Sequence, residues 1–276
     1  MDFNAKTSGR AIIEWIKNYV NNLGKKKVVI GISGGKNSAV TAGLLVEALG
    51  KERVLGIYLP TSSNTSSQEY QDAMEVAKHL GIHLDKMTIF DTFQSISKNL
   101  RLSNDGKWED EFPDTFYSYK ANTIARLRMT YLYAFAALYD DCLVVNTSDR
   151  SCNVIGYTTK FGDQAGDFSP IGNFTNEEVE ALGDYLMLPS RIVHKEATDG
   201  LWLTGDSPDE TISDETNTGI LYSDVNKFIR EGRDSVEPEV ASKIERAYEA
   251  SVHKRNLNLP TFDAGLYDFF KEKYGN

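Results

Sequence analysis

The feature that most constrains the fold is a short apolar run that ends in a Ser-Gly-Gly turn and passes directly into a helical pattern. The run covers residues 28–32 and is rich in valine and isoleucine, which favour strands. The turn occupies residues 33–35, and the helical pattern begins at Ser38. Adjacent glycines mark a tight turn. The sequence therefore predicts a strand, a tight loop and the start of a helix in immediate succession.

This loop has the chemistry of an anion-binding site. Gly34 and Gly35 let the backbone come close to a ligand and turn N–H groups inward. The first N–H groups of the next helix lack partners within the helix, and the helix dipole is positive there. The hydroxyls of Ser33 and Ser38 complete a cradle suited to phosphate or pyrophosphate. The loop lacks the Walker A spacing G-x-x-x-x-G-K-[ST]. A Gly-Gly turn by itself is more often a simple connection.

Strand and helix patterns alternate along most of the chain and indicate an α/β fold. Besides the first strand, we expect strands at residues 54–59, 82–89 and 142–146. Helices are expected at residues 11–23 with Ser8 as N-cap, and at 38–49, 71–80, 117–139, 175–186, 223–230 and 238–254. The predicted fold class is a doubly wound, Rossmann-like parallel sheet with helices on both faces. Its ligand cleft should lie at the carboxyl ends of the strands, where the strand order reverses.

Three polar segments interrupt this alternation. Residues 102–114 are expected to form a loop. Residues 147–172 are glycine-rich and irregular, and a loop of that length in a compact domain is usually functional. Residues 195–218 contain little apolar area to bury. We therefore expect this third segment to be a lid that closes on substrate through contacts such as Thr198.

Length and composition limit the function classes. The chain has 276 residues, of which 41% are hydrophobic and 25% charged, which suits one large domain. It contains no apolar run long enough to span a membrane and no apolar signal segment, so we expect no membrane contact. Two cysteines and four histidines without metal-ligand spacing suggest a reduced, cytoplasmic protein without zinc. The net charge of −10 argues against a nucleic-acid partner.

Several further motifs accompany the loop. They occupy residues 122–129 (NTIARLRM), 146–148 (NTS), 156–163 (GYTTKFGD), 213–215 (SDE) and 253–255 (HKR). With the Ser-Gly-Gly-x-x-Ser loop, this set resembles the ammonia-dependent NAD+ synthetases of the ATP pyrophosphatase superfamily. The resemblance implies an adenine nucleotide alpha hydrolase-like fold and a single domain over residues 1–276 without a glutaminase domain. It also implies a reaction in which ATP adenylates the carboxylate of deamido-NAD, and ammonia then displaces AMP to give NAD+.

The resemblance also assigns roles to residues. The implied ATP-binding positions are Gly31, Ile32, Ser33, Gly34, Gly35, Lys36, Asn37, Ser38, Thr147, Asn176 and Thr198. The implied deamido-NAD-binding positions are Arg126, Lys160, Asp167, His253 and Lys254, and Asp167 is also the implied catalytic residue. Without the resemblance, a helical arginine is more often a surface ion pair, and a basic helix end complements the dipole.

Three positions depart from the family pattern. Asn37 and Cys152 stand where the family has carboxylates that hold Mg2+, and Asn176 stands where it has a lysine that contacts the ATP phosphates. Magnesium prefers hard oxygen ligands, whereas Asn37 offers a neutral amide oxygen and the Cys152 thiol is soft. If the chain is a weakened synthetase, restoring both carboxylates should raise Mg2+-dependent amide formation.

Three functional hypotheses follow. The first is an NAD+ synthetase, or a close relative that amidates a different nucleotide-like carboxylate. The second is a non-catalytic nucleotide-binding paralogue that kept the dinucleotide pocket and lost the metal. The third is an enzyme of other chemistry, such as sulfur transfer at Cys152. The implied partners are ATP, deamido-NAD, ammonia and a second copy of the chain, which would meet through the tyrosine-rich helix at residues 117–139.

Overall fold

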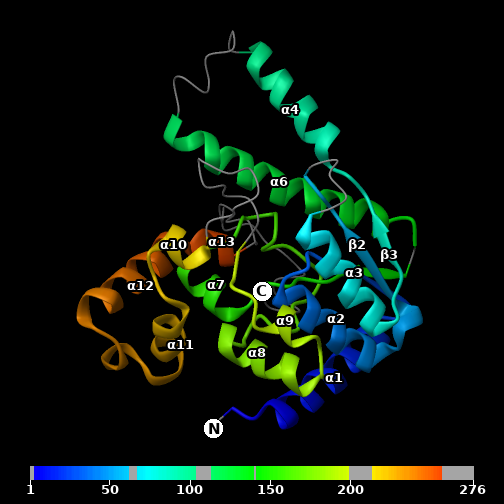
Figure 1. The fold of residues 1–276 in the computed structure, drawn as a ribbon, viewed down its shortest axis with the longest axis horizontal. Coiled ribbons are helices and arrows are strands. Elements are labelled where there is room, and N and C mark those ends of the chain that lie inside the picture. The colour runs from blue at the N-terminus through cyan, green and yellow to red at the C-terminus, as the bar shows by residue number, and fades with distance from the viewer. Residues whose placement is uncertain (1–2, 62–66, 104–112, 140, 199–212, 257–276) are drawn as a thin grey trace, which may run out of the picture.

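A four-stranded parallel sheet lies at the centre of the structure (Figure 1). This computed structural model describes residues 3–61, 67–103, 113–139, 141–198 and 213–256. The strands are β1 (Lys27–Gly31), β2 (Val54–Tyr58), β3 (Leu84–Lys86) and β4 (Cys142–Val144), in the spatial order β3-β2-β1-β4. The chain builds outward from β1 to β3 and then returns to the other side of β1. The strand order therefore reverses between β1 and β4, as a doubly wound sheet requires.

Helices cover both faces of the sheet, as predicted. One face carries α1 (Ala5–Asn22), α2 (Lys36–Leu49), α3 (Gln68–Leu80), α8 (Asn176–Tyr185) and α9 (Ser190–Val193). The other carries α4 (Phe90–Ser103) and α6 (Pro113–Ala136). A third group, beside the sheet, consists of α7 (Arg150–Ile155), α10 (Asp214–Thr218), α11 (Tyr222–Glu231), α12 (Pro238–Ala250) and α13 (Val252–Arg255) (Figure 1). Short 3-10 turns occur at Lys51–Arg53 and Arg233–Ser235.

Alternating side chains of the strands pack into two separate hydrophobic cores, one on each face of the sheet. Val28 and Ile30 belong to the core under α1, α2 and α8, whereas Val29 belongs to the core under α6. All three are fully buried. A side chain of this kind contributes about 1.5–3 kcal/mol when it is buried. Burial on both faces explains why β1 is an uninterrupted apolar run, and it fixes the end of β1 from which the Ser-Gly-Gly loop emerges.

Side-chain caps set the starts of several helices, among them α1, α3 and α8, with one correction to the sequence-based expectation. The expected helix at residues 11–23 begins earlier, at Ala5, because the Asn4 side chain accepts a hydrogen bond from the Thr7 N–H at 2.9 Å. Ser8 is therefore inside the helix, and its prediction as N-cap was wrong. By contrast, α8 starts as expected, since Thr175 and Glu178 form a reciprocal capping box.

Other boundaries also differ from the sequence-based expectations. Helix α4 fills a stretch for which no helix was expected, and α7 and α10 lie within segments expected to be irregular. Ser251 separates α12 from α13, where a single helix was expected. The expected lid at residues 195–218 falls mostly outside the described residues, so that prediction stays open. The helices α7, α10 and α13 have only four to six residues, too few for a helical period to be recognised in the sequence.

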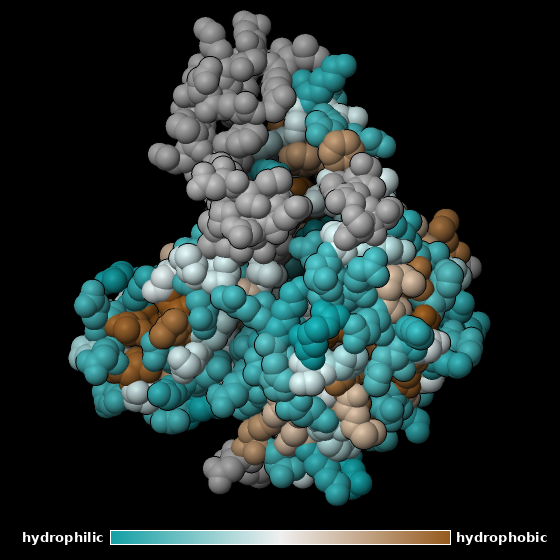
Figure 2. Space-filling view, viewed as in Figure 1, coloured by the Kyte–Doolittle hydropathy of each residue, from teal (hydrophilic) through white to brown (hydrophobic). Residues whose placement is uncertain are grey.

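The surface in Figure 2 is mostly hydrophilic, with hydrophobic residues gathered over the region of α11 and α12. Beneath it, Ile155, Ile220, Val225 and Ile244 form a separate small core. None of the helices in the described ranges combines the length and apolar character that crossing a bilayer requires.

Candidate functional site

The Ser-Gly-Gly loop leaves the sheet at the carboxyl end of β1. The Ile32 N–H donates to the Ile57 carbonyl at 2.9 Å, so the chain stays paired with β2 until the turn begins. The strand order reverses beside β1, which is where open α/β sheets bind ligands. Thr147, just beyond β4, lines the same cavity as the loop. The structure thus confirms that the loop and Thr147 share the cleft at the strand ends.

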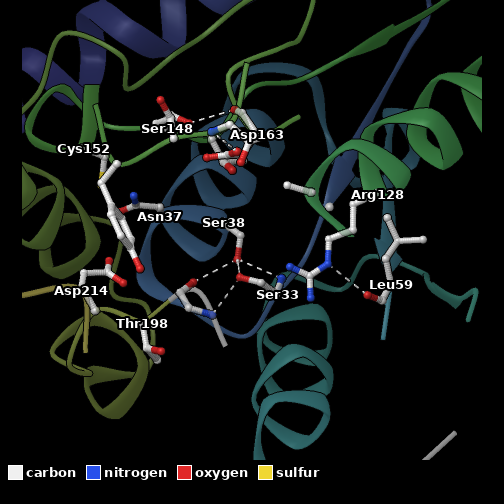
Figure 3. Close-up of a pocket in the computed structure, with 18 of the residues that line it drawn as sticks. Ser33, Asn37, Ser38, Leu59, Arg128, Ser148, Cys152, Asp163, Thr198 and Asp214 are labelled. Atoms are coloured by element: carbon white, nitrogen blue, oxygen red, sulfur yellow. Dashed lines mark hydrogen bonds between the residues drawn. The ribbon is translucent and has the colours of Figure 1, made fainter. Parts of the chain in front are cut away.

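Hydrogen bonds within the loop hold it in a closed turn. The Ser38 hydroxyl lies 3.1 Å from the Ser33 hydroxyl, accepts the Ser33 N–H at 3.2 Å and donates to the Gly35 carbonyl at 3.0 Å (Figure 3). Gly34 has a φ of +83°, and a Cβ there would lie 2.5 Å from the Glu69 carbonyl oxygen. Gly35 is the N-cap of α2 and supplies no side-chain acceptor. The first N–H groups of α2 are therefore available to an anion.

A cavity of about 530 Å³ lies over the loop, a size typical of small-molecule sites. Most of the predicted ATP-binding residues line it, namely Gly31, Ile32, Ser33, Gly35, Lys36, Asn37, Ser38, Thr147, Asn176 and Thr198. Cys152 and Lys254 also line it, whereas Gly34 lies beneath the loop against α3. Figure 3 shows Asn37, Cys152 and Asp214 together on one side, and Arg128 on the other side of the Ser33–Ser38 pair.

A buried carboxylate, Asp149, lies behind one wall of the cavity and holds three residues that line it. Its Oδ2 accepts hydrogen bonds from the Asn37 amide at 3.0 Å and from the Asn176 amide at 3.4 Å. Its Oδ1 accepts the Cys152 N–H at 2.8 Å and so caps α7. The Asn176 carbonyl oxygen in turn accepts a hydrogen bond from the Lys36 ammonium at 2.9 Å. This network joins all three positions that depart from the family pattern.

The Cys152 thiol is hydrogen-bonded and protonated. Its Sγ lies 3.1 Å from the Tyr222 hydroxyl, which donates to an Asp214 carboxylate oxygen at 3.1 Å. The tyrosine proton is thus committed to Asp214, and the thiol must donate to the tyrosine oxygen. Burial raises the pKa of Cys152 well above its ordinary range, and the Asp149 carboxylate raises it further. A neutral thiol of this kind is a poor nucleophile, which counts against sulfur transfer.

Comparison with known proteins agrees with this geometry. The sequence model of the family described as NAD synthase matches residues 9–258, almost the whole chain. The chain belongs to the NAD synthase family. The NH(3)-dependent NAD(+) synthetase of Hyperthermus butylicus is 36% identical over 269 residues, which cover 93% of this chain and 91% of that protein.

Solved structures support the same fold. NMN synthetase from Francisella tularensis superposes with a TM-score of 0.80 at 32% identity, over 95% of this chain and 100% of that one. NH3-dependent NAD synthetase from Campylobacter jejuni, in complex with the nitrate ion, gives a TM-score of 0.70 at 24% identity over 95% of this chain, a likeness of fold alone. The predicted Rossmann-like, adenine nucleotide alpha hydrolase-like fold is confirmed.

Asn37 and Cys152, the two positions at which the resemblance implies carboxylates for Mg2+, supply no carboxylate in this chain. Asn37 Oδ1 is buried and receives no hydrogen bond from any described residue, so it could provide one neutral ligand. Cys152 offers only a protonated thiol. Within the described part of the chain, no three His, Cys, Asp or Glu residues group as a metal site. Between them, Asn37 and Cys152 thus offer one amide oxygen and no carboxylate, whereas protein-held magnesium usually has one or two carboxylates. The carboxylate on this wall of the cavity belongs to Asp214.

Of the five implied dinucleotide positions, Lys254 alone belongs to the lining of the cavity. Lys254 lines the cavity and donates to the Gly156 and Thr158 carbonyls at 2.8 and 2.7 Å. Burial lowers the pKa of Lys254. Arg126 and His253 are exposed outside the described cavity lining.

Arg126 and Lys160 are nevertheless neighbours. The Arg126 Nε donates to the Lys160 carbonyl at 3.1 Å, and the Lys160 ammonium lies 5.2 Å from the centre of the Phe161 ring. Lys160 belongs to the motif at residues 156–163, and Arg126 lies beside that motif. Neither lines the cavity. Their assignment to the dinucleotide therefore stays a prediction.

Asp167 occupies the free edge of β4 and does not line the cavity either. One carboxylate oxygen accepts the Val144 N–H at 2.7 Å, and the other accepts the Tyr133 hydroxyl at 3.2 Å. Burial, followed by the Asp167 charge, raises the pKa of Tyr133 to about 12. In this arrangement Asp167 fastens the chain to the sheet. Its predicted catalytic role is not tested by this geometry.

Arg128 and Lys195 in the cavity wall, and Asp149 behind it, are among the residues that received no role from the sequence. Arg128 belongs to a quoted motif but received no role, and its Nε donates to the Leu59 carbonyl at 3.3 Å (Figure 3). Lys195 lines the cavity and donates to the buried Asp72 carboxylate at 2.9 Å. Asp149 could have been recognised only as a helix N-cap. Its contacts with α2 and α8 had no signal in the sequence.

Proposed function

We propose that the protein is an ATP-dependent synthetase that uses ammonia to convert deamido-NAD into NAD+. The observation that carries this proposal is the Ser-Gly-Gly loop at the strand-order reversal, which lines a cavity of about 530 Å³ together with Thr147. Membership of the NAD synthase family and 36% identity to an NH(3)-dependent NAD(+) synthetase support it.

The chemistry needs two displacements. In the first, the carboxylate oxygen of deamido-NAD attacks the α-phosphorus of ATP, the bond to the bridging oxygen breaks, and pyrophosphate leaves. In the second, ammonia attacks the acyl carbon, AMP leaves with the bonding electrons, and the nitrogen loses a proton. The free N–H groups at the start of α2 and the Ser33 and Ser38 hydroxyls are arranged to stabilise the departing pyrophosphate.

The remaining parts of the proposal concern the ion, the domain and the assembly. Magnesium enters only as an ion that the ATP phosphates carry, because the protein positions do not fit it.

We propose that the chain acts as a single synthetase domain that takes free ammonia, in the cytoplasm, as a homodimer. Tyr133, Leu138 and Tyr139, in and just after α6, are 39%, 77% and 36% exposed and would be covered in such a dimer. Light scattering at micromolar concentration tests it, and a monomer would refute the dimer.

A second candidate product is NMN. The structure of NMN synthetase from Francisella tularensis superposes on this chain with a TM-score of 0.80. The corresponding acid is nicotinate mononucleotide, which presents the same carboxylate to the loop without the second nucleotide. This candidate corresponds to the part of the first hypothesis in which the enzyme amidates a nucleotide-like carboxylate other than deamido-NAD.

The deciding experiment incubates the protein with ATP, an ammonium salt and either deamido-NAD or nicotinate mononucleotide. Mass spectrometry follows AMP together with NAD+ or NMN. Selective NAD+ formation supports the main proposal, and selective NMN formation supports the second candidate. If the protein binds the nucleotides but forms no AMP from ATP with either acid, the only remaining hypothesis is the non-catalytic paralogue. Cys152→Ser should retain amide formation, because the thiol takes no part in either displacement.

A further inference from the structure

Phe161 is an exposed aromatic residue with a strained backbone. Its φ is +64°, a conformation that bulky residues rarely adopt, and the residue is 50% exposed. Glycine would take this conformation without strain. An exposed phenylalanine in this conformation costs folding free energy, and such strain is found most often at ligand sites. The conformation of Phe161 thus points to a role outside the hydrophobic core.

The turn that carries Phe161 is firmly anchored to the cavity wall. The Thr159 N–H donates to Asp163 Oδ1 at 2.7 Å, and the Thr159 hydroxyl donates to the Asn122 side-chain oxygen on α6 at 2.7 Å. The Gly162 N–H donates to the Thr159 carbonyl at 2.9 Å, and Gly162 packs too closely on α6 to admit a side chain. Thr159 and Asp163 line the cavity, whereas Phe161 does not. A rigid turn therefore presents the aromatic ring to solvent beside the cavity.

Two cations accompany the ring. The Lys160 ammonium lies 5.2 Å from the ring centre, and the Arg126 Nε donates to the Lys160 carbonyl at 3.1 Å. Neither cation forms an ion pair with a carboxylate of the described residues, and the terminal nitrogens of Arg126 donate to none of these residues. In a chain of net charge −10, two such cations beside an exposed aromatic ring suit an anionic ligand that carries a flat base.

We propose that Phe161 is the stacking platform for the second base of the dinucleotide, and that this contact makes the protein select deamido-NAD over nicotinate mononucleotide. The inference rests on the proposed function, of which it specifies the acid substrate. The resemblance implied dinucleotide contacts for Arg126 and Lys160 but gave Phe161 no role. With the nicotinate end in the cavity, the adenine stacks on the Phe161 ring, and the two cations attract the pyrophosphate between the nucleosides. The mononucleotide has neither group and gains neither contact.

The test is a set of calorimetric titrations with deamido-NAD, nicotinate mononucleotide and ATP. Phe161→Gly should weaken the binding of deamido-NAD about 5- to 100-fold, the value of one stacked base, and leave the other two affinities unchanged. Phe161→Tyr keeps a flat ring and should bind all three ligands like wild type. Phe161→Leu keeps an apolar side chain without a ring and should recover only a small part of the loss.

Met187→Gly is the matched control. Met187 also has a positive φ, +54°, and is 80% exposed, but it follows α8 and does not line the cavity. This variant should leave all three affinities unchanged. Because glycine relieves the strain, neither Phe161→Gly nor Met187→Gly should lower the melting temperature. A selective loss of deamido-NAD binding then reports the missing ring and not a damaged fold.

The inference is overturned if Phe161→Gly binds deamido-NAD as tightly as wild type, or if it loses the same factor for nicotinate mononucleotide. A wild type that prefers the mononucleotide would also overturn it. If light scattering shows that Phe161→Gly changes the oligomeric state and weakens all three ligands, the ring belongs to a contact between subunits, and the inference is wrong.

Amide formation is measured separately. Binding of deamido-NAD that depends on Phe161, without amide formation, would keep this inference and refute the proposed function. Formation of NAD+ with binding that is independent of Phe161 would do the reverse.

Discussion

Asn37→Asp is the substitution whose effect the structure predicts most sharply. It restores the carboxylate of the family pattern and changes few atoms. In the folded protein, however, the Asn37 amide donates to Asp149 Oδ2 at 3.0 Å, and Asp149 is fully buried. The substitution therefore replaces a hydrogen-bond donor with a second negative charge at about the same distance. Without a metal, the restored carboxylate should destabilise the fold.

The size of the effect follows from two competing costs. Two unit charges about 3 Å apart repel by about 5–6 kcal/mol at an effective dielectric near 20. Alternatively, one carboxyl takes up a proton, which costs about 4 kcal/mol at pH 7 for a group with an ordinary pKa of about 4. The folded protein takes the less costly alternative, protonation of one carboxyl, so its cost is the upper limit of the destabilisation. The hydrogen bond that the protonated carboxyl donates to the other one offsets part of this cost. We expect Asn37→Asp to lower the free energy of unfolding by about 3–4 kcal/mol at pH 7.

The same reasoning fixes the pH dependence. The carboxyl pair holds one proton in the folded variant at a pH where the unfolded chain has lost it, so its folded-state pKa is raised. A raised pKa gives stability that grows as the pH falls. The deficit relative to wild type should therefore shrink by about 1.4 kcal/mol for each pH unit between pH 7 and pH 5.

Urea denaturation followed by circular dichroism measures these differences. The matched control is the exchange Asn37→Asp with Asp149→Asn, which restores one donor and one acceptor across the same contact and should recover most of the loss. Millimolar MgCl2 should stabilise Asn37→Asp and leave wild type unchanged, because only the variant offers two close carboxylates. If Asn37→Asp is as stable as wild type at pH 7 in EDTA, the geometry assigned to Asp149 is wrong.

Two other substitutions test neighbouring parts of the site. Gly34→Ala should lower the free energy of unfolding by about 2–4 kcal/mol, because its Cβ would lie 2.5 Å from the Glu69 carbonyl oxygen at a positive φ. Gly24→Ala is the control, because Gly24 also has a positive φ, +67°, but no atom lies within 4 Å of the added Cβ. In thermal unfolding the control should lose only about 1 kcal/mol. Burial disfavours the charge of Asp72, but hydrogen bonds from Lys195 and two other side chains outweigh it and lower its pKa. Asp72→Asn should therefore cost about 2–3 kcal/mol at pH 7. In acid denaturation this cost should begin to shrink below about pH 4, the ordinary pKa of an aspartate, and should vanish only once the pH is below the lowered pKa of the folded carboxyl; an equal loss at every pH would contradict this.

The sequence by itself determined the secondary-structure frame and the family. The apolar run of β1 had to be buried on both faces, and the Ser-Gly-Gly turn had to end a strand and begin a helix. The helix expected at residues 175–186, with Glu177 and Glu178 in its first turn, is present as α8. These signals are local, because they depend on side chains a few residues apart along the chain. The same local chemistry failed at Ser8, where Asn4 offered an equally good cap one turn earlier.

Only the tertiary structure decided what the three departures from the family pattern mean. Asn37 meets Asp149 across 112 residues of sequence, and Lys36 meets Asn176 across 140. Cys152 meets Tyr222 across 70 residues. No periodicity encodes such pairs, since they arise where α2, α7, α8 and α11 pack together. Each substituted residue looks like the loss of a charge in the sequence. In the fold, each has a hydrogen-bond partner, because buried polar groups that lose a ligand must find another.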